Sequence, residues 1–253
     1  GQVDKALATM SESVRLARLV ENLTPLSGTQ ADLGWTYGLL GAVDRGFDFA
    51  YQGLATAEEK LPILRAWPQA ILVLLYLLQG DIAAGETMSA KLPDYAKIRD
   101  GFGYMPFMWI RVGLAKAELA MSKQNYGLAG ALADQLCDDL YAGGIRYLRP
   151  DVLLLKGRSL LAQKPGRIGE AVEILRQARA EAEALGSRRT LWPILAILGD
   201  IEQERGRIVE ADSLRQQARE VIRYIVGHTT TPELKRSFLG LPAVKALLPD
   251  QPG

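Results

Sequence analysis

Apolar side chains recur along this chain at intervals of three and four residues, the spacing of one face of an α-helix. Two such faces lie in the C-terminal half: Leu191, Leu195, Leu198 and Ile201, followed by Leu214, Ala218, Val221 and Ile225. Residues 153–161 and 172–184 repeat the arrangement. Long stretches that alternate apolar and polar residues, which would indicate strands, do not occur. The pattern therefore predicts an all-α chain.

A short motif recurs between neighbouring helical stretches. The sequence Gly-Arg-Ile-x-Glu-Ala is identical at residues 166–171 and 206–211, and the same frame fits residues 1–6. Looser copies are found at 45–50, 79–84 and 124–129. The alanines that end the six copies are spaced by 44, 34, 45, 42 and 40 residues: Ala6, Ala50, Ala84, Ala129, Ala171 and Ala211.

Each copy combines a helix stop with a close helix contact. A glycine in the left-handed conformation ends the first helix, and the small alanine lets the second helix approach the first. We therefore expect one helix–turn–helix hairpin per copy, stacked as a repeat array. Breaks in the pattern are expected where one hairpin gives way to the next, near residues 23–28, 91–93, 100–103, 142–144 and 185–187.

The small residues also fit a known repeat. With Ala50 at position 20 of the tetratricopeptide repeat (TPR), the consensus residues at positions 8, 24, 27 and 32 fall on Gly38, Leu54, Ala57 and Pro62. The copies that end at Ala171 and Ala211 fit the same frame. The chain thus resembles a TPR array over most of residues 1–226, which implies a right-handed α-solenoid of TPR-like helical hairpins.

The long spacing between the alanine anchors points to a particular group of TPR arrays. Repeats of 40–45 residues imply lengthened helices or loops between hairpins. They resemble the arrays at the C-terminal end of large bacterial signal-transduction ATPases, including the maltose-regulator type of transcription factor, and of cyclase-linked relatives. Residues 219–248 are similar to the tail that closes many such proteins.

The sequence also predicts the structure at each end of the chain. Residues 3–22 form a second helix without its first, so the array opens in mid-repeat at Gly1, and the natural protein is expected to continue N-terminally. Thr231 followed by Pro232 predicts the start of a capping helix, which 240–242 ends. We predict a TPR-like array over residues 1–226, and a C-terminal capping helix with a frayed tail over residues 227–253.

Composition narrows the function. The 253 residues include 30 basic and 29 acidic side chains with no basic block, so a nucleic-acid partner is not expected. The longest apolar run, residues 70–78, falls short of the roughly 20 that a membrane helix needs. Cys137 and His228 are the only residues of their kinds, which argues against disulfides, metal sites and a Ser-His-Asp triad. We predict a cytoplasmic, non-enzymatic protein with no cofactor.

The remaining candidates for chemistry have simpler explanations. His228 follows the end of a helix and suits the helix C-terminal dipole. Cys137 lies among apolar residues, and its acidic neighbours disfavour a reactive thiol. Asp134, Asp138 and Asp139 share a helix but offer too few oxygen ligands for a hard cation, so they are expected in solvent.

Arginines over residues 176–223 are the densest charge feature. The interleaved carboxylates are expected to lie at the surface and pair with them: Glu181, Glu183, Glu202 and Glu204. A solvated, ion-paired face is favoured, and a docking face for an acidic protein is the alternative.

The TPR resemblance also implies a binding face, because the first helices of such arrays line the concave surface through positions 2, 5, 9 and 12. In this chain the positions fall on Asp32, Trp35, Gln69, Tyr76, Arg111, Glu118, Lys156, Gln163, Asp200 and Gln203. We call these ten residues the predicted binding positions. A mixed polar and aromatic set suits recognition of a peptide or a helix, in which aromatic and arginine anchors supply most of the affinity.

The leading hypothesis is a non-catalytic scaffold module that binds a protein, a peptide or a neighbouring domain, within a larger bacterial signalling or transcription-regulatory protein. The alternative is a small-ligand sensor in which Trp35, Tyr76 and Trp109 stack on a sugar or metabolite. A third hypothesis is a structural role, with self-association through the open helix at residues 3–22. Aromatic residues near the starts of first helices are otherwise expected to pack against the preceding hairpin.

Overall fold

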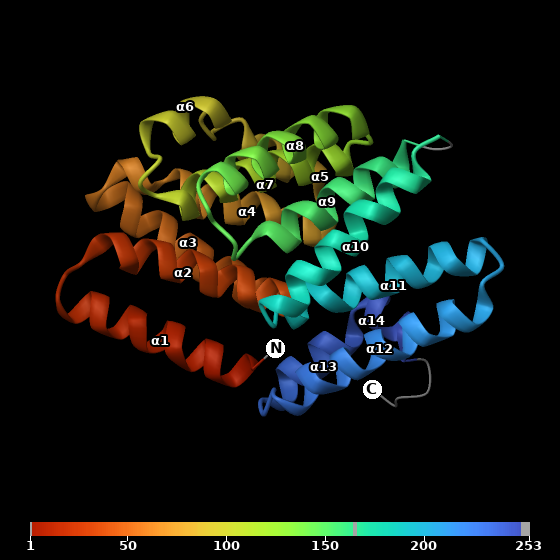
Figure 1. Ribbon diagram of the computed structural model, residues 1–253. Coiled ribbons are helices and arrows are strands. Elements are labelled where there is room, and N and C mark those ends of the chain that lie inside the picture. The colour runs from red at the N-terminus through yellow and green to blue at the C-terminus, as the bar shows by residue number, and fades with distance from the viewer. Residues whose placement is uncertain (1, 164–165, 249–253) are drawn as a thin grey trace. The chain divides into compact units, whose positions relative to one another are not determined.

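The computed structural model describes residues 2–163 and 166–248, and within these ranges every regular element is a helix (Figure 1). The elements are α1 (Val3–Leu19), α2 (Leu23–Leu39), α3 (Val43–Lys60), the 3-10 turn η1 (Pro62–Leu64), α4 (Ala66–Gln79), α5 (Ile82–Ser89), α6 (Tyr95–Gly101), α7 (Pro106–Ser122), α8 (Tyr126–Ala142), α9 (Arg149–Ala162), α10 (Ile168–Ala184), α11 (Arg188–Glu204), α12 (Ile208–Gly227), α13 (Pro232–Gly240) and α14 (Pro242–Leu247). The all-α prediction is confirmed.

The chain divides into two compact units, and the boundary falls inside α8. Residues 4–132 form one, which we call the N-terminal unit. Residues 133–253 form the other, together with residues 1–3, and we call it the C-terminal unit. The predicted boundary between array and cap at residue 226 stays a prediction.

Glycines bring α2 and α3 into backbone contact in the N-terminal unit. A Cβ atom on Gly34 would lie 2.5 Å from the Gly46 carbonyl oxygen, and one on Gly46 would lie 2.8 Å from the Gly34 carbonyl oxygen. The Ser27 hydroxyl donates a hydrogen bond to the Gly53 carbonyl oxygen at 2.8 Å. Ala50 is fully buried beside Gly34. The small residues therefore set how closely this hairpin packs.

Helix α4 lies in the core of the N-terminal unit. Residues 70–75 are almost completely buried, and the helix contacts α2, α3, α5 and α7. The stretch Pro62–Gln79 is long and apolar enough to cross a membrane by length and composition, yet 56% of it is buried inside the fold. Its neighbouring helices therefore account for its apolar character.

An inserted helix explains the longest repeat spacing. Helices α4 and α5 form one hairpin, in which α5 has only eight residues. The seven-residue α6 follows before α7 begins. Asp94 caps α6, accepting hydrogen bonds from the backbone N–H groups of Ala96 and Lys97. The 45 residues between Ala84 and Ala129 thus hold an extra element rather than longer hairpin helices.

Two hairpins, α9–α10 and α11–α12, build most of the C-terminal unit (Figure 1). Their anchors Ala171 and Ala211 are fully buried. A Cβ atom on Gly199 would lie 3.3 Å from the Ala211 carbonyl oxygen, so position 8 meets position 20 as the TPR frame implies. Gly206 has a φ of 75° and makes the predicted left-handed turn between α11 and α12.

The last two helices pack against α12. Thr231 and Pro232 begin α13 where predicted, although the Thr231 side chain makes no capping hydrogen bond. Helix α13 ends at Gly240 and α14 begins at Pro242, so the chain breaks within residues 240–242, as predicted. Phe238 of α13 meets Trp192 of α11 edge to face, with ring centroids 6.5 Å apart. The predicted frayed tail at 249–253 lies outside the described residues.

Some details of the repeat frame are wrong. Residues 23–28 form the first turns of α2, and the break comes earlier because Glu21 adopts a φ of 53°. Between α2 and α3 the left-handed residue is Gly41, whereas Gly46 lies inside α3. Between α7 and α8 it is Gln124, with a φ of 60°. In these two turns another residue, Gly41 or Gln124, therefore takes the role that the frame gave to the glycine of the copy.

The alanine anchor also shifts in two copies. Ala84 is half-buried because Gly85 takes the inner place, where a Cβ atom would lie 3.2 Å from the Leu77 side chain. Ala6 is exposed, while Leu7 next to it is buried. Gly1, which was expected at a hairpin turn, lies outside the described residues.

Candidate functional site

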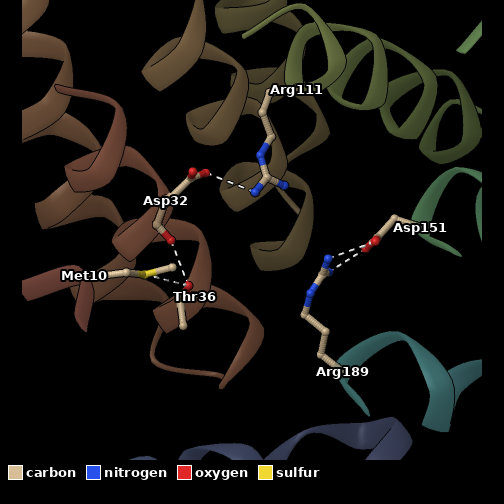
Figure 2. A network of polar contacts seen from close by, with 6 residues as sticks. All are labelled: Met10, Asp32, Thr36, Arg111, Asp151 and Arg189. Atoms are coloured by element: carbon tan, nitrogen blue, oxygen red, sulfur yellow. Dashed lines mark hydrogen bonds and ion pairs between the residues drawn. The ribbon is translucent and has the colours of Figure 1, made fainter. Parts of the chain in front are cut away.

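Two of the predicted binding positions meet in the N-terminal unit. Asp32 on α2 faces Arg111 on α7, with Nη2 3.0 Å from Oδ1 (Figure 2). Both side chains are largely buried, and Oδ1 accepts no hydrogen bond from a described residue, so we describe the contact as an ion pair. The Thr36 hydroxyl donates to the Asp32 carbonyl oxygen at 2.8 Å and lies 3.7 Å from the Met10 sulfur of α1 (Figure 2). Glu118, on α7, is half-buried.

The positions on α2 and α4 differ in exposure. Trp35 is half-buried and lies well inside α2 rather than near its start. Gln69 is only 8% exposed. The half-buried Tyr76 has its hydroxyl 2.5 Å from that of Tyr51 on α3 and its ring 4.8 Å from Phe47. The sequence analysis missed this aromatic cluster, although the four-residue spacing of Phe47 and Tyr51 indicates a shared helix face.

In the C-terminal unit, Lys156 on α9 and Gln163, the C-terminal cap of that helix, both have partners. The Lys156 ammonium lies 2.7 Å from an Asp134 carboxylate oxygen on α8. Partial burial acts to lower the pKa of Lys156, but the hydrogen bond and the charge of Asp134 outweigh it, so this pKa is raised. The Gln163 amide oxygen accepts a hydrogen bond from Arg167 at 3.3 Å.

Asp200 and Gln203 hold one arginine of their own hairpin. Arg215 of α12 donates to Asp200 at 2.8 Å and to Gln203 at 3.3 Å. Both acceptors are exposed residues of α11. At least six of the ten predicted binding positions thus make ion pairs or hydrogen bonds to charged groups of their own unit: Asp32, Arg111, Lys156, Gln163, Asp200 and Gln203.

The structure adds a polar contact that the sequence analysis missed. Arg189 on α11 binds Asp151 on α9 with both terminal nitrogens, at 2.5 and 2.9 Å (Figure 2). Thr190 lies 3.4 Å from the same carboxylate. This pair joins the first helices of two successive hairpins. The partners are 38 residues apart, so no local pattern indicates the contact.

The tryptophans serve mainly in packing. Trp67 stacks on Phe107 with ring centroids 5.9 Å apart, and its indole fills the space that a Cβ atom on Gly28 would need. Trp109 is 4% exposed and meets Tyr95 edge to face. Packing against the preceding hairpin is therefore confirmed for Trp67. Trp109 is too buried to stack on a ligand, which corrects that part of the sensor hypothesis.

The single histidine terminates a helix, as predicted. His228 is the C-terminal cap of α12, and its Nδ1 lies 2.9 Å from the Tyr224 carbonyl oxygen. Its ring stacks on Tyr224, over which Arg188 also lies at 3.9 Å. Within the described residues, no group of three or more His, Cys, Asp or Glu side chains is placed to hold a metal ion.

The arginine-rich segment is largely ion-paired. Arg176 binds Glu173 through exposed side chains, and the half-buried Arg179 binds the exposed Glu183, with both pairs within α10. Glu202 departs from the prediction of a surface residue, because it is only 2% exposed. Arg205 and Arg207 both bind its carboxylate, and the contacts are close. The prediction of pairing holds for this residue, while the prediction of exposure is wrong.

Burial makes the single thiol a testable feature. Burial raises the pKa of Cys137 from its ordinary value of 9.0 to about 11, because the thiolate would lose solvation. At about pH 8 we expect a disulfide reagent to label the folded protein about 100-fold more slowly than the unfolded protein, in line with the smaller thiolate fraction. The folded state should also lose stability as the pH rises from 9 toward 11, since only the unfolded chain then releases the proton. Equal labelling rates would contradict this assignment.

Comparisons with known proteins agree with this geometry at the level of the fold. No protein-family model matches the chain, and no curated relative was found. Among solved structures, BtubC (BKLC) from P. vanneervenii is similar with a TM-score of 0.55 and 17% identity, over 91% of this chain and 94% of that one. A kinesin light chain of Podosopora anserina with nearly identical TPR-like repeats has a TM-score of 0.51 and 21% identity, over 76% and 93%.

These similarities identify the fold as a TPR-like helical repeat, an all-α solenoid class. Folds of this class commonly mediate contacts between proteins and are generally non-catalytic. At such low identity the likeness concerns the fold alone.

Proposed function

We propose that this chain is a non-catalytic, protein-binding scaffold module of a cytoplasmic bacterial signalling or transcription-regulatory protein. The observation that supports the proposal is the Asp32–Arg111 ion pair, which joins two predicted binding positions from separate hairpins of the N-terminal unit. The TPR-like hairpins support it, because repeats of this kind present side chains of successive first helices side by side. The regulatory context rests on the resemblance of the long repeats to bacterial regulator arrays.

Charge pairing at the predicted binding positions of each unit favours a partner with its own charges. Arg111 and Lys156 each have a carboxylate partner in this chain, so a ligand must compete with or extend these pairs. A protein surface can do both, because it offers several polar groups at once. Trp35 is the half-buried aromatic residue of the set that remains free of a stacked ring, and it suits an anchoring contact.

The test is a selection of binding fragments from a displayed peptide and protein-fragment library, followed by affinity measurements on single variants. We expect Trp35→Ala and Tyr76→Ala, two variants in the N-terminal unit, to weaken the selected partners by about tenfold or more. Lys5→Ala and Arg18→Ala, two exposed positions on α1, should change affinity by less than about twofold. Unchanged affinity in both face variants, with all variants folded, would contradict the assignment.

A charge swap separates binding from folding at the ion pair. The double variant Asp32→Arg/Arg111→Asp keeps an ion pair between α2 and α7 but reverses its direction. We expect the thermal midpoint to stay near that of the native chain while the selected partner loses affinity. If binding survives the swap, the pair serves only to hold the two helices.

A further inference from the structure

A groove with a cavity volume of about 600 Å³ opens in the N-terminal unit, beside the inserted helix α6. It is bounded by the end of α3, η1, the first turns of α4, the connection at residues 91–93, and α6. The volume falls in the range of pockets that bind ligands. The groove exists because the chain leaves the regular hairpin pattern after α5, and it contains only one of the predicted binding positions, Gln69.

Unpaired cations surround this groove. Arg65, Lys91 and Lys97 line it, all three are exposed, and none makes an ion pair with another described residue. Arg65 uses its Nε only to donate to the Pro62 carbonyl oxygen at 3.0 Å. Glu58 is the one carboxylate in the lining. The groove therefore carries an excess of two positive charges, whereas most arginines of the C-terminal unit are neutralised by nearby carboxylates.

The lining between the cations is apolar. Leu92 and Ile98 are buried beneath it, and the half-buried Phe102 and exposed Ile63 face its edges. Apolar walls with a few convergent polar groups are typical of binding pockets. An apolar side chain of a ligand would gain contact here, while a small inorganic anion would leave these surfaces unused.

After the cations and the apolar lining, the third feature of the groove is the amide side chain of Gln69. Gln69 is 8% exposed and lines the groove, and no side-chain hydrogen bond joins it to another described residue. A side-chain amide both donates and accepts, which matches the N–H and C=O groups of an extended peptide backbone. The Gln69 amide atoms are not among the buried polar atoms that lack a partner, so they reach solvent, and a bound peptide backbone can take the place of that water.

We propose that this groove docks an acidic peptide segment that carries an apolar side chain between its carboxylates. The carboxylates bind Arg65, Lys91 and Lys97, the apolar side chain packs on Leu92 and Ile98, and Gln69 bonds the peptide backbone. The inference rests on the proposed function in that the partner is a protein. It adds a second contact surface in the N-terminal unit, whose lining does not include Trp35.

The experiment is fluorescence polarisation with labelled nonapeptides on the full chain. One peptide alternates aspartate with leucine, a second alternates asparagine with leucine, and a third alternates lysine with leucine. We expect the aspartate peptide to bind at least about tenfold more tightly than the other two, and to weaken with added salt. Equal affinity for the aspartate and asparagine peptides would overturn the proposal.

Matched charge reversals localise the binding. Lys91→Glu/Lys97→Glu should weaken the aspartate peptide by at least about tenfold, while Lys5→Glu/Arg18→Glu on α1 makes the same change in net charge and should alter affinity by less than about threefold. Gln69→Leu should weaken the peptide without changing its salt dependence. Equal losses in both double variants would show attraction to net charge alone and overturn the groove assignment.

Two further measurements separate this proposal from the proposed function. Inorganic pyrophosphate should compete no better than sodium chloride of equal ionic strength, and competition at the affinity of the peptide would overturn the peptide assignment. Trp35→Ala should leave the aspartate peptide unaffected. If Trp35→Ala abolishes peptide binding and the Lys91/Lys97 variant does not, the groove is wrong and the binding face remains.

Discussion

Replacing Arg149 with Met is expected to destabilise the C-terminal unit by about 3 kcal/mol, because it strands a buried carboxylate. The Arg149 side chain is 12% exposed, and its Nη1 lies 3.6 Å from Glu181, which is 18% exposed. Its guanidinium also lies over the Tyr141 ring at 4.1 Å, and Nη2 donates to the Leu140 carbonyl oxygen at 3.4 Å. One side chain thus joins α8, α9 and α10.

The measurement is urea unfolding of four proteins: the native chain, Arg149→Met, Glu181→Met and the double variant. The double variant should recover most of the loss, since removing both charges leaves nothing buried and uncompensated. The exposed pair Arg176 and Glu173 is the control, and Arg176→Met should cost less than about 1 kcal/mol. If Arg149→Met lowers the free energy of unfolding no more than Arg176→Met does, the expected cost of leaving a buried carboxylate unpaired is contradicted.

Gly34→Ala is expected to lower the free energy of unfolding of the N-terminal unit by about 1–3 kcal/mol, although alanine favours helices. The new Cβ atom would lie 2.5 Å from the Gly46 carbonyl oxygen and 3.0 Å from the Ala50 backbone nitrogen. Both obstacles are backbone atoms, so α2 and α3 must move apart. Their separation would loosen the packing around Ala50, which is fully buried.

The control for this substitution lies in the same unit. Gly127, in the first turn of α8, has nothing within 4 Å of an added Cβ atom. Gly127→Ala should leave stability unchanged or raise it by up to about 1 kcal/mol. Thermal and urea unfolding of both variants measure the difference. A Gly34→Ala protein as stable as the Gly127→Ala protein would contradict the close backbone contact.

Sequence periodicity was enough to predict the hairpins but not the details of their turns. The copies at 206–211 and 166–171 predict their hairpins clearly, because a glycine, a β-branched residue and an alanine occur together in each. The structure buries the alanine anchors of both copies. The weaker copy at 79–84 shifted by one residue to Gly85. A small residue satisfies a close helix contact at either position, so the local pattern leaves the register open. Only packing against Leu77 decides it.

In the candidate site, too, the sequence predicts some contacts, and tertiary packing alone decides others. The repeat frame placed Asp32 and Arg111 at equivalent positions of separate hairpins, and the structure brings them together. The Asp151–Arg189 pair and the groove beside α6 had no signal in the sequence. Contacts over 38 residues and a cavity formed by an inserted helix depend on how elements stack, which residue spacing does not encode.

By itself, the amino-acid sequence determined that the chain is helical, that its helices pair as hairpins, and where small residues allow close contact. Those properties follow from local periodicity and side-chain size. The tertiary structure decided which charged groups neutralise one another, that Trp109 and Glu202 are buried, and that three cations around α6 remain unpaired. Burial and pairing are properties of neighbours in space, and stacked helices draw those neighbours from distant parts of the chain.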